Sequence, residues 1–226
     1  IFFILKYKYL EGFKNRNIDL KCEELINKLV IIKSNPYYRI GDIFYDTKQR
    51  HYEGIDVKGV LEKKEFDNTI LREYLLKHKK KSDYKLLLNI INRKEKEYSY
   101  EIPDKNTLVI HLRAGDTVVF NWFLKKDYKD LIEQKLKKNP NINKIVFVCC
   151  LQYGDYKEKN RWMYSIEKNN LNKIKIKKLF KKLLISFPKL KFDLISNREI
   201  DKDITFMVKS NFFIRSYENS SKQLFS

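Results

Sequence analysis

Apolar and charged positions along the chain follow two alternating spacings, which predict strands that alternate with helices. Residues 1–10 are rich in Phe, Ile and Tyr, which is typical of a strand, and a glycine-containing turn at residues 11–12 interrupts it. Apolar side chains then recur at helical spacing over residues 18–29, and residues 29–32 are short, apolar and β-branched, as in a buried strand. The first third of the chain is therefore predicted to be a β-α-β unit.

The middle of the chain is strongly charged and helical in its spacing. Residues 60–98 carry two separate apolar faces, which predict two helices joined near Ser82-Asp83. Pro103-Asp104 then separates this segment from residues 107–112, which begin with the run Thr-Leu-Val-Ile. Such a run predicts a strand buried on both faces, as parallel strands are.

The second half of the chain repeats the alternation of strand and helix. After the strand at 107–112 the predicted elements are a helix at 126–138, a strand at 144–150, helices at 156–168 and 174–185, a strand at 190–195, a helix at 201–209 and a strand at 212–214. This alternation predicts an α/β fold with a parallel sheet covered by helices. A boundary near Tyr100 divides an N-terminal α/β half, residues 1–100, from a C-terminal half, residues 101–226, with ligands expected at the carboxyl ends of the strands.

Composition narrows the class of protein. Of 226 residues, 43% are hydrophobic and 14% aromatic, enough for a core and too many for a wholly disordered chain. The three cysteines, Cys22, Cys149 and Cys150, lack the spacing of a zinc site or of a disulfide framework, and the adjacent pair is interpreted as packing residues on opposite faces of a strand. No uncharged stretch approaches the roughly 20 apolar residues of a membrane-spanning helix.

The formal net charge of +19 has two interpretations. Lysine and arginine attract nucleic acids and other polyanions, so the chain could be a non-catalytic basic module with such a partner. However, the lysines are spread over nearly every segment among many Asn, Ile and Tyr, which is typical of an A+T-rich coding sequence. We favour this second interpretation and do not expect a nucleic-acid partner. The tight basic run at residues 77–81 lies at a predicted helix end, where cations complement the helix dipole.

The most informative stretch is the predicted strand 107–112 with the residues that follow it. Four residues with possible functional roles, His111, Arg113, Gly115 and Asp116, lie within six positions at its end. His111 and Arg113 share one face by the period of two, so an imidazole and a guanidinium with several donors would project together. Gly115 allows backbone to approach a ligand, and Asp116 could orient the arginine. The alternative is a structural Arg–Asp pair beside a hydrogen-bonded histidine.

Residues 111–116, His-Leu-Arg-Ala-Gly-Asp, resemble the HxRxGD signature of the fucosyltransferase superfamily that includes the α1,2-, α1,6- and protein O-fucosyltransferases. Glu-Gly-Phe at residues 11–13 and the segment at residues 40–46 are similar to the first motif and following strand of the type-2 protein O-fucosyltransferases. Residues 203–216 resemble the last motif of the family, an Asp-headed helix followed by a strand and a Ser-rich turn. The resemblance extends over almost the whole chain through three short islands.

The resemblance implies a GT-B fold, in which two Rossmann-like halves face each other across a ligand cleft. It implies that GDP-fucose is the donor substrate and that fucose passes with inversion to a Ser or Thr hydroxyl of a protein, without a metal ion or other cofactor. The implied acceptor is a small folded extracellular module such as a thrombospondin-type repeat. The implied location is the endoplasmic reticulum and the secretory pathway.

The resemblance also assigns roles to residues. Arg113 would bind the β-phosphate and the glycosidic oxygen, where leaving-group charge develops. Glu11 matches the general base that removes the proton from the acceptor hydroxyl. His111 would position the nucleotide sugar, and Asp203 would accept hydrogen bonds from the base. The remaining donor-binding candidates are Gly115, Ser216, Ser220 and Ser221, and two further candidates are Asn15 and Asp116.

The chain departs from the pattern of the family in two turns, and these departures support a third interpretation. Lys14 stands where the type-2 pattern has asparagine, with Asn15 one place later, and Glu218 lies within the Ser-rich turn. A homologue that keeps the fold and has lost turnover would show such changes. Glu11 would then be an ordinary turn carboxylate, and Asp201 and Asp203 would be acids stabilised by the amino end of a helix.

Overall fold

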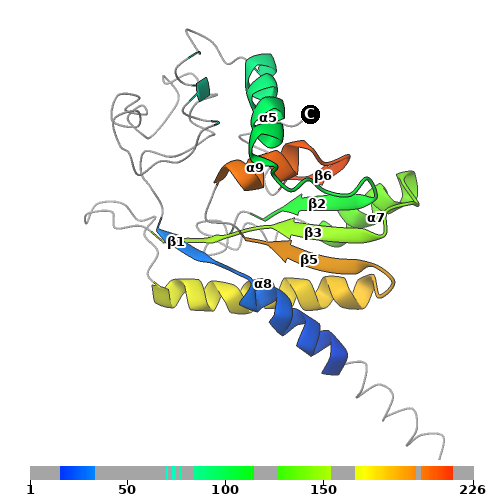
Figure 1. Cartoon of the computed structure of the whole chain (residues 1–226). Helices are drawn as coiled ribbons and strands as arrows, with labels where there is room; N and C mark the ends of the chain where they lie inside the picture. The colour runs from blue at the N-terminus through cyan, green and yellow to red at the C-terminus, as the bar shows by residue number, and fades with distance from the viewer. Residues whose placement is uncertain are drawn as a thin grey trace, which may run out of the picture.

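The computed structural model describes residues 16–33, 70, 73, 74, 77, 84–112, 114, 127–153, 166–196 and 200–215. The described chain has an α/β fold built on a parallel sheet (Figure 1). A helix at residues 16–27 comes first. The labelled elements follow in the order β1 (Ile31–Lys33), α5 (Tyr84–Tyr98), β2 (Thr107–His111), α7 (Tyr128–Lys138), β3 (Lys144–Val148), β4 (Leu151–Tyr153), α8 (Ile166–Ser186), β5 (Lys191–Ile195), α9 (Ile200–Val208) and β6 (Phe212–Ile214).

The main sheet has four parallel strands in the order β5-β3-β2-β6. His111 at the end of β2 is opposite Val148 at the end of β3, and Val148 is opposite Ile195 at the end of β5. The chain moves outward from β2 through β3 to β5 and then returns through α9 to β6, on the other side of β2. A second parallel pair, β1 with β4, continues from the end of β3.

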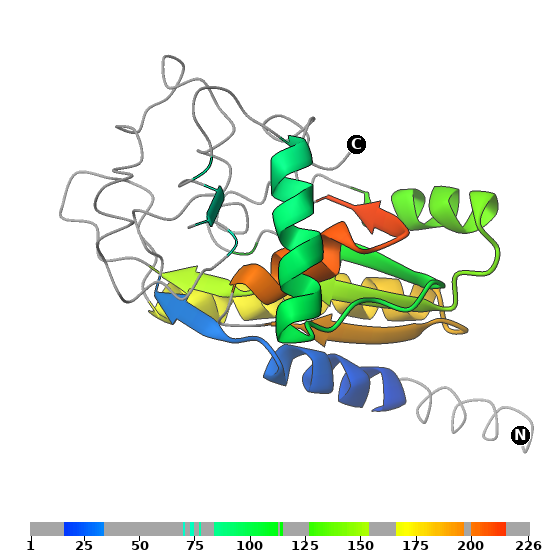
Figure 2. The same ribbon diagram turned by 45° about the horizontal axis from the view of Figure 1, so that its top comes forward.

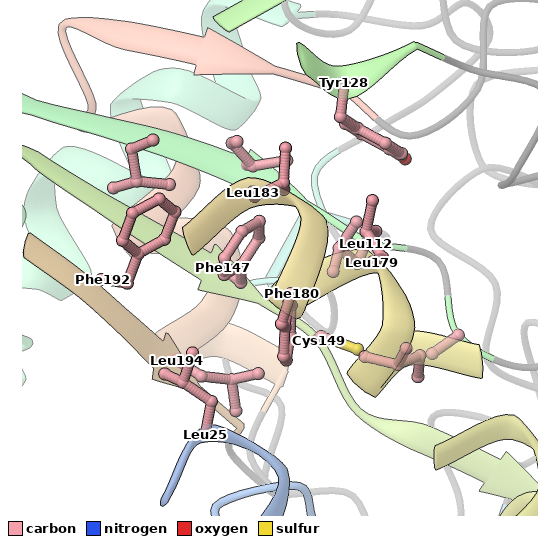
Figure 3. Close-up of a cluster of buried hydrophobic side chains, with 14 of the residues drawn as sticks. Leu25, Leu112, Tyr128, Phe147, Cys149, Leu179, Phe180, Leu183, Phe192 and Leu194 are labelled. Carbon is pink, nitrogen blue, oxygen red and sulfur yellow. The ribbon is translucent and has the colours of Figure 1, made fainter. Parts of the chain in front are cut away.

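One face of the sheet carries the largest buried cluster, to which the helix at residues 16–27, α7 and α8 contribute. At its centre the rings of Phe147 and Phe180 lie 4.6 Å apart between their centroids, and those of Phe147 and Phe192 lie 6.2 Å apart (Figure 3). β2 and β3 supply alternate buried residues to this face. Burial of this apolar surface is the main stabilising contribution to the fold.

The opposite face of the sheet is covered by α9, and α5 lies across α9 (Figure 2). Phe206 of α9 packs on Val109, Val146 and Val148 of the central strands. Ile204, on another side of α9, packs with Ile90 and other buried residues of the α5 region. The strands β2 and β3 are therefore buried on both faces, which for β2 confirms the prediction made from residues 107–112.

The helix at residues 16–27 is held to α8 and β5 by both apolar and charged contacts. Leu25, which is fully buried, belongs to the same cluster as Phe180 of α8. Lys181 Nζ lies 2.6 Å from Asp19 Oδ1, and Lys177 pairs with Glu23. These ion pairs are partly exposed, so each contributes modestly and the buried apolar contact dominates.

Several of the predicted elements are found with small shifts at their ends. α7 begins just after Asp127, whose side chain caps it by accepting from the N–H groups of Lys129 at 3.0 Å and Asp130 at 3.3 Å. The predicted strand at 29–32 is β1, shifted toward its carboxyl end. Ser82-Asp83 and most of residues 60–83 lie outside the described residues, as does the predicted strand at 1–10.

Two predictions in the second half of the chain are corrected. Separate helices ending at 168 and beginning at 174 are wrong, because α8 is continuous over Ile166–Ser186. The polar residues between them do not break it, and one of them, Asn172, is itself buried. The predicted strand 144–150 is divided, with β3 ending at Val148 and β4 beginning at Leu151, so that Cys149 and Cys150 lie between two strands.

Within the part of the chain that the structure describes, none of the helices has the length and apolar character needed to cross a membrane.

Asp193 is expected to make stability depend on pH in the acid range. Burial raises the pKa of its carboxyl, but hydrogen bonds from Lys28 Nζ at 2.6 Å and from the Leu194 N–H at 2.8 Å outweigh burial and hold the pKa below its ordinary value. Its stabilising contribution is therefore complete above the unfolded pKa, near 3.8, and is lost as the pH falls through the lower folded value.

We expect the free energy of unfolding, measured by urea titration from about pH 5.5 to about pH 3, to fall less steeply in Asp193→Asn than in the native chain. The variant Asp130→Asn removes the same charge from an exposed position of α7 and controls for net charge. Equal slopes in the native chain and Asp193→Asn would contradict the expectation.

Candidate functional site

The carboxyl ends of the parallel strands meet at one edge of the sheet, called here the carboxyl edge (Figure 1). The strand order reverses at β2, because the chain leaves β2 toward β3 and later returns to β6 on its other side. In open α/β sheets a ligand crevice forms outside the carboxyl ends at such a reversal. The end of β2 is therefore the place where a site is expected.

His111 is the last residue of β2 and is half-buried. The chain beyond it remains aligned with its neighbour, since the Leu112 N–H donates to the Val148 carbonyl at 2.9 Å and Ala114 forms a parallel bridge with Leu151. The backbone on both sides of position 113 thus follows the end of β3 and the start of β4. The sequence placed His111 at a strand end, and the structure confirms that position.

Asp203 reaches the same edge from the first turn of α9. It is half-buried, and its charge is close enough to the Cys149 thiol, directly after β3, to help raise the pKa of that thiol. His111 is opposite Val148, the residue before Cys149. The structure therefore places two residues from distant motifs, His111 and Asp203, near the carboxyl end of β3.

Asp201, in the same helical turn, has a structural role. Its side chain is buried, with 2% of its surface exposed, and its Oδ2 accepts from the Ile70 N–H at 3.0 Å. The amino end of α9 favours both acids through its partial positive charge. Asp201 thus holds a distant backbone segment against α9. Asp203 is therefore the better candidate in this turn for binding a ligand.

Ser196 is a residue of this edge that the sequence did not single out. It follows β5, and its Oγ accepts from the Val30 N–H at 2.9 Å. The Val30 carbonyl in turn accepts from the Leu151 N–H at 2.9 Å. Ser196 therefore ties β1 to the carboxyl edge. The only sequence signal for this role is a short polar side chain directly after a buried strand.

The cysteines of the described chain are suited to packing. Burial is the main cause that raises the pKa of Cys149, with smaller contributions from Cys150 and Asp203. Burial also raises the pKa of Cys22. A thiol that stays protonated is a poor nucleophile, so neither cysteine is placed for covalent catalysis.

The other predicted site residues lie outside the described residues. They are Glu11, Asn15, Arg113, Gly115, Asp116, Ser216, Ser220 and Ser221. Convergence of Glu11 and Arg113 with His111 and Asp203 stays a prediction. Among the described residues, no group of three or more His, Cys, Asp or Glu side chains is arranged to hold a metal ion.

Comparison of the chain with models of known families, with curated proteins and with solved structures finds no match. The carboxyl edge is therefore interpreted from the residues of this chain alone.

Proposed function

We propose that the protein is an inverting glycosyltransferase that moves fucose from GDP-fucose to a Ser or Thr hydroxyl of a protein acceptor, with the two-domain GT-B arrangement. The observation that supports this proposal is that His111 and Asp203 both lie near the carboxyl end of β3. They belong to two separate motifs that resemble the fucosyltransferase superfamily. A parallel sheet with its order reversal at β2 is a suitable frame for a nucleotide-sugar donor.

In this proposal one residue acts on the acceptor hydroxyl and three residues act on the donor GDP-fucose. Glu11 takes the proton of the hydroxyl while that oxygen bonds to the anomeric carbon from the side opposite to GDP. The bond between that carbon and the β-phosphate oxygen breaks, and its electron pair leaves with GDP. Arg113 offers two or more donors to the charge that develops on this oxygen. Asp203 accepts hydrogen bonds from the base, and His111 positions the sugar nucleotide.

The acceptor and the compartment are part of the same proposal. A small folded extracellular module would present the hydroxyl, and the reaction would take place in the secretory pathway. The departures at Lys14 and Glu218 favour a second candidate, a homologue that binds the donor without turnover.

A general polyanion-binding role is less well supported. Lys21, Lys28, Lys177 and Lys181 pair with carboxylates around the helix at residues 16–27, so these lysines do not form an uninterrupted basic face. Such a role also predicts binding that depends on total charge and falls steeply with salt.

Calorimetric titration with GDP and GDP-fucose tests the proposal without knowledge of the acceptor. We expect saturable binding at both about 50 mM and about 200 mM salt, because the contacts are specific hydrogen bonds as well as charges. Asp203→Asn is expected to weaken GDP at least about tenfold while ADP, bound weakly, changes little, because the lost acceptor serves the guanine base.

Asp130→Asn is the matched control, since Asp130 is a first-turn acid of another helix, α7. It is expected to leave both affinities unchanged. Failure of the native chain to bind either guanine nucleotide would refute the proposal. Binding without any consumption of GDP-fucose would instead support the homologue that has lost turnover.

A further inference from the structure

A groove of about 390 Å³ lies at the opposite edge of the sheet from the proposed active site. It runs between the helix at residues 16–27, the end of α8 and the first residues of two strands. Lys144 begins β3 and Lys191 begins β5, so the groove belongs to the amino edge of the sheet. Its volume falls in the range of small-molecule sites, and the proposed transfer reaction uses none of its residues.

One wall of the groove is apolar and fixed. It consists of Leu184, Leu190 and Phe192. Phe192 is 5% exposed, and its ring is stacked on that of Phe147 in the main core. Leu184 and Leu190 are partly buried against the same core, so the wall is preformed, and these two residues supply most of the surface that an apolar group could contact.

The polar side of the groove is a chain of alternating charges. Lys21 Nζ lies 2.6 Å from Glu24 Oε2, and Lys28 Nζ lies 3.5 Å from Glu24 Oε1. Lys28 Nζ also lies 2.6 Å from Asp193 Oδ1, and Lys144 Nζ lies 3.6 Å from Asp193 Oδ2. This chain begins and ends with lysine, so its two carboxylates leave one positive charge in excess.

Lys191 adds a second positive charge to the groove. It is exposed and, among the residues that the structure describes, has no carboxylate within ion-pair distance. The groove therefore combines two uncompensated positive charges with an apolar wall. A phosphate monoester is close to a dianion at neutral pH, whereas a carboxylate brings a single charge.

We propose that this groove binds a small phosphate monoester that carries an apolar group. The phosphate lies against Lys191 and the lysine-terminated charge chain, and the apolar group lies against Leu184, Leu190 and Phe192. Most of these lysines are partly exposed, so each contact is weak and the affinity depends on the phosphate and the apolar group acting together.

Phenyl phosphate is a suitable probe, titrated into the full chain and followed by changes in backbone amide resonances. We expect saturable changes confined to the groove, with binding at least about tenfold tighter than that of inorganic phosphate or phenol. Equal affinity for phenyl phosphate and inorganic phosphate would overturn the role of the apolar wall. Changes spread over lysines throughout the chain would show general attraction of anions and would overturn the site.

Two charge-reversal variants complete the test. Lys191→Glu is expected to weaken phenyl phosphate at least about tenfold, because it reverses the uncompensated charge. Lys189→Glu makes the same change two residues away, at an exposed lysine that does not line the groove, and is expected to change the affinity less than about twofold. Equal effects of the two variants would refute the proposal. Both positions are exposed, so thermal unfolding should be unchanged and can be checked directly.

Discussion

Replacing Phe180 with alanine is expected to lower the free energy of unfolding by about 3–5 kcal/mol. Phe180 is fully buried on α8, and its ring lies 4.6 Å from that of Phe147 between their centroids (Figure 3). The buried cluster to which it belongs also includes residues of the helix at residues 16–27, of α7 and of the central strands. These elements are fixed by the sheet, so they cannot close fully over the cavity that the missing ring leaves.

Urea denaturation followed by far-ultraviolet circular dichroism measures this loss, with Ile185→Ala as the control. Ile185 lies on the same helix but is 54% exposed, so its truncation is expected to change the free energy of unfolding by less than about 0.5 kcal/mol. Both variants replace a large apolar residue with a good helix former, which separates loss of packing from helix propensity. Similar losses in the two variants would show that α8 does not present Phe180 to the sheet.

The sequence was sufficient to predict strands and helices where burial is uniform. β2 and β3 are buried on both faces, and their polar residues, Thr107, His111 and Lys144, stand only at the strand ends, so the apolar residues between them are easily assigned to strands. α8 was harder, because a buried Asn172 among lysines and asparagines looks like a break when packing is unknown. Its continuity depends on tertiary contacts that override local propensity.

The strand order could not be derived from periodicity. Within the main sheet, β2, β3 and β5 are neighbours in chain order, as is common, but β6 returns to the far side of β2. This return makes β2 a central strand, and the carboxyl end of β2 therefore lies where the strand order of the sheet reverses. Nothing in the local sequence of β6 specifies its neighbour, since that choice depends on how α9 packs across Val109, Val146 and Val148.

In the candidate site, too, some residues could be predicted from the sequence and others could not. His111 and Asp203 were predicted because each lies at the end of a recognisable element and belongs to a motif. The roles of Asp201 and Ser196 were not predicted, because each depends on a single backbone N–H from a distant part of the chain, that of Ile70 and that of Val30. Such pairings leave no local pattern, so only the folded structure reveals them.

The ion pairs of individual lysines change the interpretation of the net charge of the chain. Lys177 and Lys181 of α8 meet Glu23 and Asp19, so these cations hold two elements together. Lys191 has no such partner among the described residues and lies beside an apolar wall. A net charge of +19 therefore says less about function than the small number of positive charges that remain uncompensated in one place.

Under the proposed function, Arg113→Ala is expected to reduce the rate at which the protein consumes GDP-fucose by about 10²–10³-fold. The leaving GDP gains negative charge as the glycosidic bond breaks, and the guanidinium is the group proposed to stabilise that charge. Because the charge is largest in the transition state, the affinity for GDP-fucose should fall much less than the rate. Hydrolysis of GDP-fucose, with water in place of the acceptor, provides a measurement that needs no knowledge of the acceptor.

Arg113→Lys and Arg16→Ala make the test specific to the guanidinium and to its position. Lysine keeps the charge but cannot donate two parallel hydrogen bonds, so its rate should lie between those of the native chain and Arg113→Ala. Arg16 is exposed at the start of the first described helix, and Arg16→Ala removes the same charge far along the sequence from the motif. A rate retained in Arg113→Ala would exclude Arg113 from the reaction, since a group that stabilises the leaving phosphate cannot be removed without slowing its departure. An equal loss in Arg16→Ala would show that the effect comes from net charge and not from the position of Arg113.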